Sequence, residues 1–315
     1  MKIRAHEEAD VARLSQGILD CQNSGISLPG IQTIDSREVF LNQMIDSVRR
    51  IKYVSTLAIP RRDISQHRAD GNSLLFDPLK AAIWHLRQGN IDEASWLAFL
   101  FVHFGKHKKS GWRYAREVYG ALGAAQGWTW ERVSAAPKAF RAWLEDNEHT
   151  LKRGVNRGFG NHRKYVSMSA TKASGTGAAI ETYTQWVMAA GSHTALFTNA
   201  EMQAKGAPEI AFDRLYKSMK VRSFARMGKF DYLTMIGKLG IANIRPGNAY
   251  MKGATGPVAG ARLMFHVQGT PQLSITQLSQ RMIDMGRYLG VGMQEMEDAI
   301  CNWQKSPVKY EYFGG

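Results

Sequence analysis

Glycine spacing in the stretch Ala249–Gln280 constrains this chain more than any other feature of its sequence. Gly253, Gly256 and Gly260 surround the start of an apolar segment, Ala259–Val267, in which apolar residues recur at helical spacing. Glycine lets a backbone reach positive φ and approach another surface closely, which a Cβ atom would block. The stretch therefore predicts a hairpin between two helices. The apolar residues expected against a core are Val258, Leu263 and Phe265 or His266.

The second helix of this hairpin is expected to begin with a phosphate site. Pro257 suits the first helical turn, because the N–H group that proline lacks has no partner there. The remaining free N–H groups and the positive end of the helix dipole together attract one phosphate. Such a contact holds DNA without reading its base sequence. The residues expected at this site are Gly253, Thr255, Gly256 and Gly260.

An excess of basic residues indicates an anionic partner. Lys and Arg outnumber Asp and Glu by 41 to 27, which gives a formal net charge of +14. Nucleic acid is the first candidate, because neutralisation of phosphates by Lys and Arg supplies most non-specific affinity for DNA. The alternative is a protein that carries this charge on its surface with no such partner.

Two basic segments carry aromatic residues among their cations. The first, Gly105–Tyr114, has the pattern of a loop that follows a phosphate backbone and stacks on bases, although its Trp112 is equally suited to docking the next helix. The second, Gly154–Tyr165, contains three glycines, which favour a loop. It is either a basic surface loop or a segment that orients an extruded nucleotide. Expected DNA contacts are Lys106, Lys108, Lys109, Arg113, Arg163 and Lys164, with His162 near the reacting base and Trp112 and Tyr165 in the base pocket.

The composition excludes several classes of protein. Cys21 and Cys301 cannot supply a four-cysteine zinc site or iron–sulfur cluster, and two distant cysteines fit a reducing cytoplasm. The N-terminus lacks the apolar core of a signal peptide, and the longest apolar run, Trp96–Phe104, is too short to cross a bilayer. We expect a cytoplasmic protein with no cofactor, no metal, no membrane contact and no protein partner.

The apolar periodicity predicts a mainly α fold, because no segment shows the sustained alternation of a β-strand. Asp77 and Pro78 are typical of a helix start, and Asp92-Glu93 places acid at the start of the next helix, whose body is apolar all round. Ser169–Gly177 is small and polar, as a linker would be. We expect an N-terminal helical extension over 1–75, a helical lobe with basic loops over 76–170, and a hairpin lobe over 171–315.

Asp231 is the carboxylate most suited to catalysis. It lies near the start of an expected helix, beside two cations and between the aromatic residues Phe230 and Tyr232, of which Tyr232 is expected in the base pocket. An anion at a helix start is stabilised, and it can support a cationic sugar or activate a water molecule. The alternative is a simple charge at a helix N-terminus. Asp284 is the second candidate.

The glycine-rich stretch resembles the helix-hairpin-helix DNA glycosylases. Ala254-Thr255-Gly256 matches the family's hairpin, Gly269-Thr270-Pro271 its Gly-x-Pro step, and Leu273–Ile275 the short hydrophobic run that follows. The resemblance implies two helical lobes with a cleft between them. Thr276 stands where the family has its catalytic Asp, and Ala254 replaces the first hairpin glycine unless Gly253 takes its place. The scaffold is therefore expected without the family's usual catalytic residue, which is why Asp231 ranks first.

Over a longer range, from about Phe76 to the C-terminus, the chain resembles the third clade of the α-glutamyl/putrescinyl-thymine pyrophosphorylases. The likeness rests on FVHFGKHKKSGWRYAREVYG, GNHRKY, GKFDYLTMIGKLG and YMKGATGPVAGARLMF. The family is considered a branch of the helix-hairpin-helix glycosylase fold from phage and bacterial systems that handle modified DNA bases. Some members look like defensive glycosylases that remove glucosylated hydroxymethylcytosine from phage DNA.

Three functions follow from this resemblance. The first is a monofunctional DNA glycosylase that flips out a bulky modified cytosine and hydrolyses its bond to the sugar, which needs only water and a carboxylate. No lysine stands out as a Schiff-base nucleophile. The second is a transferase in which an amine displaces pyrophosphate from a pyrophosphorylated hydroxymethyluracil. The third is a DNA-binding protein without catalysis.

Overall fold

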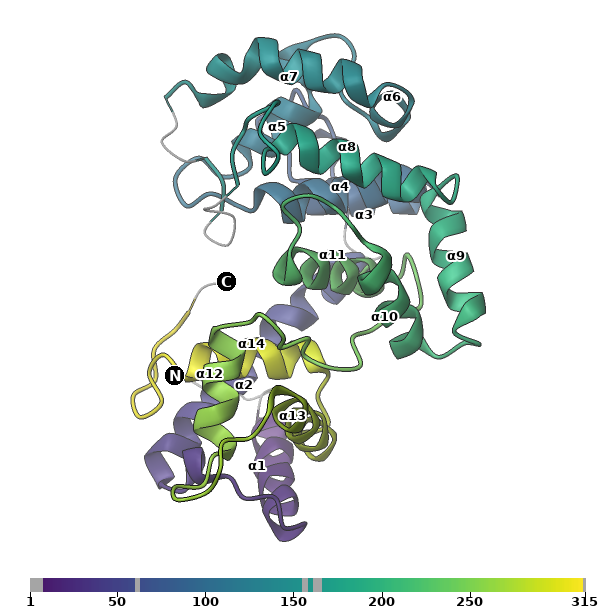
Figure 1. The fold of residues 1–315 in the computed structure, drawn as a ribbon. Coiled ribbons are helices and arrows are strands. Elements are labelled where there is room, and N and C mark those ends of the chain that lie inside the picture. The colour runs from purple at the N-terminus through teal and green to yellow at the C-terminus, as the bar shows by residue number, and fades with distance from the viewer. Residues whose placement is uncertain (1–7, 60–62, 155–157, 161–165, 314–315) are drawn as a thin grey trace. The chain divides into compact units, whose positions relative to one another are not determined.

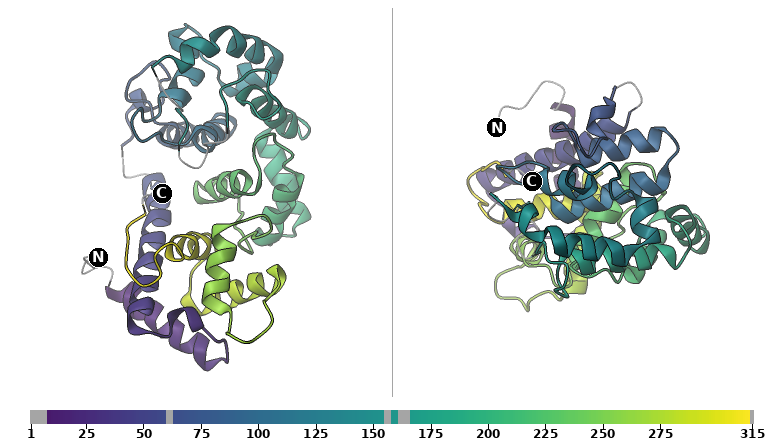
Figure 2. Two further views of the ribbon diagram at one scale, coloured as in Figure 1. Left: turned by 60° about the vertical axis from the view of Figure 1, so that its left-hand side comes forward. Right: turned by 90° about the horizontal axis from the view of Figure 1, so that it is seen from above.

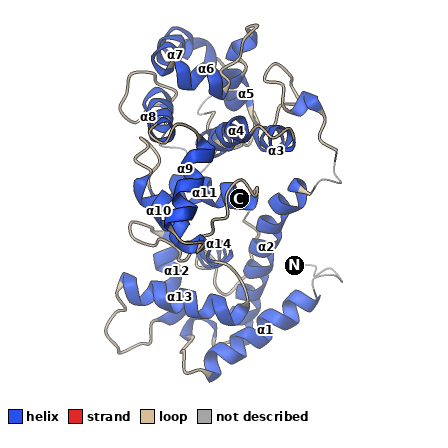
Figure 3. Ribbon diagram, turned by 90° about the vertical axis from the view of Figure 1, so that its right-hand side faces the viewer, coloured by secondary structure: helices blue, strands red, loops and turns tan. Residues whose placement is uncertain are grey.

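The computed structural model describes residues 8–59, 63–154, 158–160 and 166–313. Within these ranges the chain forms fourteen α-helices and short 3₁₀ turns, and its β structure is confined to two isolated bridges, His107 with Gly111 and Ser167 with Gly175. Figure 3 shows helices joined by loops throughout. The mainly α fold predicted from the sequence is confirmed. No helix in the described ranges combines the length and the apolar character needed to cross a membrane.

Contacts between Cα atoms divide the chain into two compact units. One unit joins residues 1–56 with residues 246–315, and the other is the continuous stretch 57–245. These boundaries differ from the divisions at 75/76 and 170/171 expected from composition. Helices from the two ends of the chain pack together in one unit, and no local pattern in the sequence indicates this packing.

The first unit is a group of five helices around one apolar core (Figure 1). The helix α1 packs along α13, while α12 packs on α14 and on the 3₁₀ turn η2. Trp303 is fully buried in this core and meets the ring of Phe40 edge-on at 5.7 Å between centroids. The elements are α1 (Glu8–Asn23), η2 (Pro29–Ile31), α2 (Ile34–Ala58), α12 (Gly256–Phe265), α13 (Ile275–Leu289) and α14 (Met293–Trp303).

Glycine makes the contact between α12 and α14 possible. A Cβ atom on Gly260 would lie 2.4 Å from the carbonyl oxygen of Ile300, and one on Gly256 would lie 2.6 Å from Sγ of Cys301. Both distances are shorter than carbon atoms tolerate, so only glycine allows the two helix backbones to approach this closely. These glycines therefore let α12 lie close against α14.

The second unit is built around α4, which lies between α8 and α11 in Figure 1. The helix α4 packs against α3, α5, α6, α9 and α11. The helices surrounding it are seen from two further sides in Figure 2. The elements are η3 (Gln66–Arg68), α3 (Pro78–Arg87), α4 (Ile91–Phe104), α5 (Arg113–Tyr119), η4 (Ala121–Gly123), α6 (Trp130–Ala135), α7 (Pro137–Lys152), α8 (Thr176–Met188), α9 (His193–Gln203), α10 (Pro208–Ser218) and α11 (Arg226–Lys238).

The starts of α3 and α4 are as the sequence predicts. Asp77 accepts hydrogen bonds from the backbone N–H groups of Leu79 and Lys80, and Pro78 occupies the first turn. Asn90 caps α4 through the N–H of Glu93. Almost every residue of α4 is buried, which agrees with its apolar composition on all sides.

Three local expectations differ from the structure. Leu263 was expected against the core but is 43 % exposed, because the face of α12 that packs on its neighbours carries Ala261 and Met264, and Leu263 lies on another face. Residues 239–255 contain no helix, so the hairpin turn is not directly preceded by one. The segment 169–177 is not a linker: it lies inside the second unit, where a Cβ on Gly175 would meet the carbonyl of Ser169 at 2.2 Å.

Candidate functional site

The segment before α12 forms a tight turn at Gly253. Gly253 has φ of +79°, and the N–H of Ala254 closes the turn on the carbonyl of Met251 at 2.8 Å. Thr255 stands at the helix cap but makes no side-chain cap hydrogen bond. The N–H groups of the first helical turn are therefore not satisfied by a capping side chain, and they are accompanied by the positive end of the helix dipole.

The four residues expected at this phosphate site have different positions. Gly253 and Thr255 are exposed at the turn, and Gly256 is partly exposed. Gly260 is buried against α14, so its contribution is to the packing of α12 rather than to a ligand contact. The residue before the turn, Tyr250, has φ of +47°, a strained angle for a side chain of that size. Strain of this kind is concentrated at functional segments.

The first basic segment forms a tight turn that presents two lysines. His107 and Gly111 exchange backbone hydrogen bonds of 3.0 and 2.9 Å, and Nδ1 of His107 accepts the N–H of Ser110 at 3.1 Å. Lys108 and Lys109 occupy the tip of this turn and are exposed. Lys106, just before the turn, is exposed as well. The turn holds these ammonium groups at the surface of the second unit, where a DNA phosphate can reach them.

Arg113 and Trp112 have structural partners. Nε of Arg113 donates to Glu117 at 2.7 Å and its Nη1 donates to the carbonyl of Arg153 at 2.9 Å. The ring of Trp112 packs on Phe101 with centroids 4.9 Å apart, at the start of α5. Of the two interpretations of Trp112, docking of the following helix is the one that describes its place in the fold. His162, Arg163, Lys164 and Tyr165 lie outside the described residues.

Asp231 lies in the second turn of α11 and is partly exposed. The residues three and four positions later on this helix, Thr234 and Met235, are buried, whereas Met227, four positions earlier, is 41 % exposed. The carboxylate is therefore at the edge between the core and the surface of its unit.

The second candidate, Asp284, lies in α13 and already has partners. It accepts Nε2 of Gln280 at 2.9 Å and pairs with Arg287 at 3.4 Å. Thr276 is exposed in the first turn of the same helix, where Ser274 and Gln277 form a capping box. The position that the sequence resemblance compares with the glycosylase Asp therefore lies in the well-formed first turn of α13 and is occupied by Thr276.

Tyr232, the residue after Asp231, is fully buried and belongs to a chain of hydrogen bonds rather than to an open pocket. The chain runs from Tyr232 to Tyr183 at 2.9 Å, to Nε2 of His193 at 2.6 Å, and from Nδ1 of His193 to Asp92 at 2.6 Å. His193 and both tyrosines have no exposed surface. The chain connects α11 to α8, α9 and the start of α4.

The direction of each hydrogen bond follows from the chemistry of its ends. Burial lowers the pKa of His193, and the nearby Asp92 only partly offsets that effect. The hydrogen bonds from His193 lower the pKa of Asp92, which stays a carboxylate. Nδ1–H of a neutral His193 must therefore donate to Asp92, and its Nε2 accepts from Tyr183, whose oxygen accepts from Tyr232. Every polar group of the chain is satisfied in this arrangement.

The sequence did not single out this chain of residues. Asp92 has the position of an ordinary acidic residue at a helix start, and His193 lies 101 positions away from it. Ser192 caps α9 by accepting the N–H of Ala195. Nothing local indicates that the capped histidine would meet a carboxylate from another helix.

One comparison with known proteins identifies the family of this chain. The family model described as alpha-glutamyl/putrescinyl thymine pyrophosphorylase clade 3 matches residues 35–315. The chain belongs to this family. The description of clade 3 names an enzyme that acts on a modified thymine. No curated protein and no solved structure matches the chain. In this clade 3 chain the match covers the hairpin, both basic segments and α11.

The two buried tyrosines of this clade 3 chain give a matched pair of variants. Tyr232→Phe removes one donor and leaves no buried group without a partner, so we expect a loss of roughly 0.5–1.5 kcal/mol in unfolding free energy. Tyr183→Phe leaves Nε2 of His193 and the hydroxyl of Tyr232 unpaired, and we expect a loss of roughly 2–4 kcal/mol. Urea denaturation followed by circular dichroism measures both. Equal losses would contradict the proposed direction of the chain.

The same chain predicts how stability depends on pH. Because the pKa of His193 is lowered in the folded state, the unfolded chain binds more protons below its ordinary pKa of about 6.5. Stability is therefore complete above pH 6.5 and falls on acidification, by at most about 1.4 kcal/mol per pH unit for this one group. His193→Gln should show a shallower slope between pH 7 and 5. Burial also lowers the pKa of His85, which keeps its contribution in both proteins. An unchanged slope would show that His193 titrates alike in both states.

Proposed function

We propose that the chain is a DNA glycosylase that hydrolyses the bond between a bulky modified cytosine, such as glucosylated hydroxymethylcytosine, and its deoxyribose. The proposal rests on membership of a family named for enzymes of modified DNA bases and on one structural observation, the partly exposed carboxylate of Asp231. The product is an abasic site. In a cell attacked by phage whose DNA carries such bases, this activity is a defence.

Support for DNA binding comes from two separate surfaces. The turn at Gly253–Gly256 offers backbone N–H groups to one phosphate, and the turn at His107–Gly111 presents Lys108 and Lys109. Neither contact distinguishes one base sequence from another. Both suit an enzyme that searches along DNA for a rare base and then extrudes it.

Support for catalysis comes from the way α11 is held. Asp231 precedes Tyr232, which the chain of hydrogen bonds anchors to three other helices. A catalytic carboxylate works best on an element that cannot shift, because its distance to the reacting carbon must stay constant. In this proposal, the hydrogen bonds on the buried side of α11 keep Asp231, on its partly exposed side, in a constant position.

The reaction breaks the bond between the base nitrogen and C1′ of the sugar. As that bond lengthens, positive charge develops on the sugar, and the carboxylate of Asp231 stabilises it. Water then adds its oxygen to C1′ and loses a proton to the carboxylate. The departing base takes up a proton on the nitrogen that held the sugar. His162 is proposed as its source.

The family description favours a second candidate function, a transferase. In that reaction the nitrogen of an amine attacks the methylene carbon of a pyrophosphorylated hydroxymethyluracil, and the carbon–oxygen bond breaks to release pyrophosphate and a proton. The glycosidic bond remains intact. The two functions are distinguished by mass spectrometry of the products: free base and abasic sites for the first, and an aminated base with pyrophosphate for the second.

Replacement of Asp231 tests the glycosylase. Asp231→Asn should slow base release by roughly 10²- to 10⁴-fold, because the amide cannot stabilise the cationic sugar or accept a proton. DNA binding should change little. The assay is incubation with phage DNA that contains glucosylated hydroxymethylcytosine, with ordinary DNA alongside, followed by mass spectrometry of released bases.

Asp284→Asn serves as the comparison, because its carboxylate already pairs with Arg287. If Asp284→Asn loses activity and Asp231→Asn does not, the catalytic role belongs to α13. Release of no base by the unaltered protein, with DNA still bound, would leave the transferase or a non-catalytic role.

Neutralising the basic turn tests the DNA contact. Lys108→Ala with Lys109→Ala should weaken binding to all DNA sequences and reduce the slope of log affinity against log salt by about 2, one unit for each phosphate that a lysine no longer neutralises. The matched control is Lys138→Ala with Lys217→Ala, which removes the same charge from exposed sites on α7 and α10. An equal change in both double variants would mean that the total charge, and not the turn, determines binding.

A further inference from the structure

The segment that joins α10 to α11 carries cations with no assigned role (Figure 1). Its first four residues alternate apolar and basic side chains. Met219 and Val221 are buried, whereas Lys220 and Arg222 are exposed. Burial of the apolar residues thus leaves both basic side chains directed to solvent.

Hydrogen bonds hold this segment in one conformation. The backbone N–H of Arg222 donates to Oγ1 of Thr182 at 2.9 Å, and Oγ of Ser223 donates to the carbonyl of Ser174 at 2.7 Å. Phe224, the next residue, is buried in the core of the second unit. The basic side chains therefore extend from backbone positions that are fixed before any ligand binds.

Lys229 of α11 belongs to the same group of cations. Its Nζ donates to the carbonyl of Tyr216 at 3.4 Å and lies 5.3 Å from the centre of the ring of that residue. Burial lowers the pKa of Lys229, and the positive charge of Lys220 lowers it further. An ammonium group has three N–H donors, so the single carbonyl leaves donors for a ligand. Two like charges are therefore held near each other beside the end of α10.

Within the described ranges, no ion pair with Asp or Glu neutralises Lys220, Arg222 or Lys229. Lys217, three positions before Lys220, differs from them, because its Nζ pairs with Asp213 at 2.5 Å. Cations that stay unpaired repel one another, and an anion bound among them relieves that repulsion. The three unpaired cations thus favour an anionic ligand.

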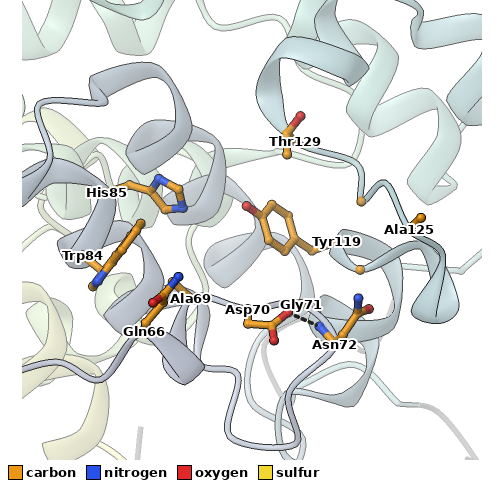
Figure 4. A pocket seen from close by; sticks show the side chains of 12 residues that line it. Gln66, Ala69, Asp70, Gly71, Asn72, Trp84, His85, Tyr119, Ala125 and Thr129 are labelled. Carbon is orange, nitrogen blue, oxygen red and sulfur yellow. Dashed lines mark hydrogen bonds between the residues drawn. The ribbon is translucent and has the colours of Figure 1, made fainter.

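A cavity of about 350 Å³ beside the end of α5 does not have this property. Figure 4 shows Tyr119, Trp84 and His85 among the side chains that line it. None of its described lining residues is Lys or Arg, and its carboxylate, Asp70, is exposed. A phosphate group would find no cation among these residues. The segment before α11 is therefore the better place for an anion.

We infer that Lys220, Arg222 and Lys229 form a further contact with the phosphate backbone of DNA, in addition to the two surfaces described above. The inference rests on the proposed function, because it takes DNA as the ligand. A guanidinium group can donate to two oxygens of one phosphate, whereas each ammonium acts as a point charge. The contact adds affinity without reading the base sequence. The segment leads directly into α11, so DNA bound here is held by the unit that carries Asp231.

Removal of the two exposed cations tests the contact. Lys220→Ala with Arg222→Ala should weaken binding to all DNA sequences and reduce the slope of log affinity against log salt by about 2. The measurement is fluorescence anisotropy of a labelled duplex of ordinary bases at several salt concentrations. Lys138→Ala with Lys217→Ala is the matched control, because it removes the same charge from exposed residues outside the segment. Its slope should change little.

Two substitutions of Lys229 separate its charge from its packing. Lys229→Met removes the charge and keeps an unbranched side chain beside Tyr216, and it should reduce the slope by about 1. Lys229→Arg keeps the charge and should retain the slope of the unaltered protein. If Lys229 only packed against Tyr216, the methionine variant would leave the slope unchanged.

The inference is overturned if the double variant and its control change the slope equally, or if Lys229→Met and Lys229→Arg bind DNA alike. Because the duplex contains ordinary bases, these measurements do not depend on base release. A protein that binds DNA through this segment and releases no modified base would contradict the proposed hydrolysis alone. A protein that releases the base and tolerates the double variant would contradict this inference alone.

A free phosphate ion is the other source of the same chemistry. Isothermal titration calorimetry with inorganic phosphate tests it. Saturable phosphate binding that Lys220→Ala with Arg222→Ala abolishes, while DNA affinity and its salt slope stay unchanged, would assign the segment to a free ion and overturn the DNA contact. We expect the opposite result, a change in DNA affinity with no saturable binding of inorganic phosphate.

Discussion

Burial of α4 on nearly all sides is the constraint on which the second unit depends. A helix in that position has little access to water, so its charged and ring side chains depend on partners in neighbouring elements. Glu93 is satisfied by Tyr119 and Trp130, Asp92 by His193, and the ring of His103 hydrogen-bonds Thr176 at 3.1 Å. Each pair joins α4 to a different part of the unit.

These polar contacts restrict the relative positions of the helices in this unit more strictly than apolar packing does. Apolar side chains tolerate small shifts, whereas a buried carboxylate that loses its donor destabilises the fold by a few kcal/mol. The positions of α8, α9 and α11 around α4 are therefore fixed by few interactions. The same contacts hold α11, the helix that carries Asp231, in a fixed position within its unit.

The sequence predicts where several helices begin, but it does not predict which other helices they pack against. Asp77, Pro78 and the acidic start of α4 are local signals, because a cap acts on the helix that begins beside it. The pairing of Asp92 with His193 and the packing of α1 against α13 are non-local. No periodicity in either segment encodes which other segment it meets, and so the division of the chain into units differs from the one that composition suggests.

At the candidate sites, too, local conformation was predictable from the sequence and non-local packing was not. The glycines of the hairpin were expected in a tight turn, and Gly253 has the positive φ that such a turn needs. Their contact with a phosphate stays a prediction. The burial of Gly260 depends on α14, some forty residues later in the chain, and was missed. Tyr232 was expected in a base pocket because it adjoins Asp231, but adjacent residues of a helix face different directions, and its side chain points into the core.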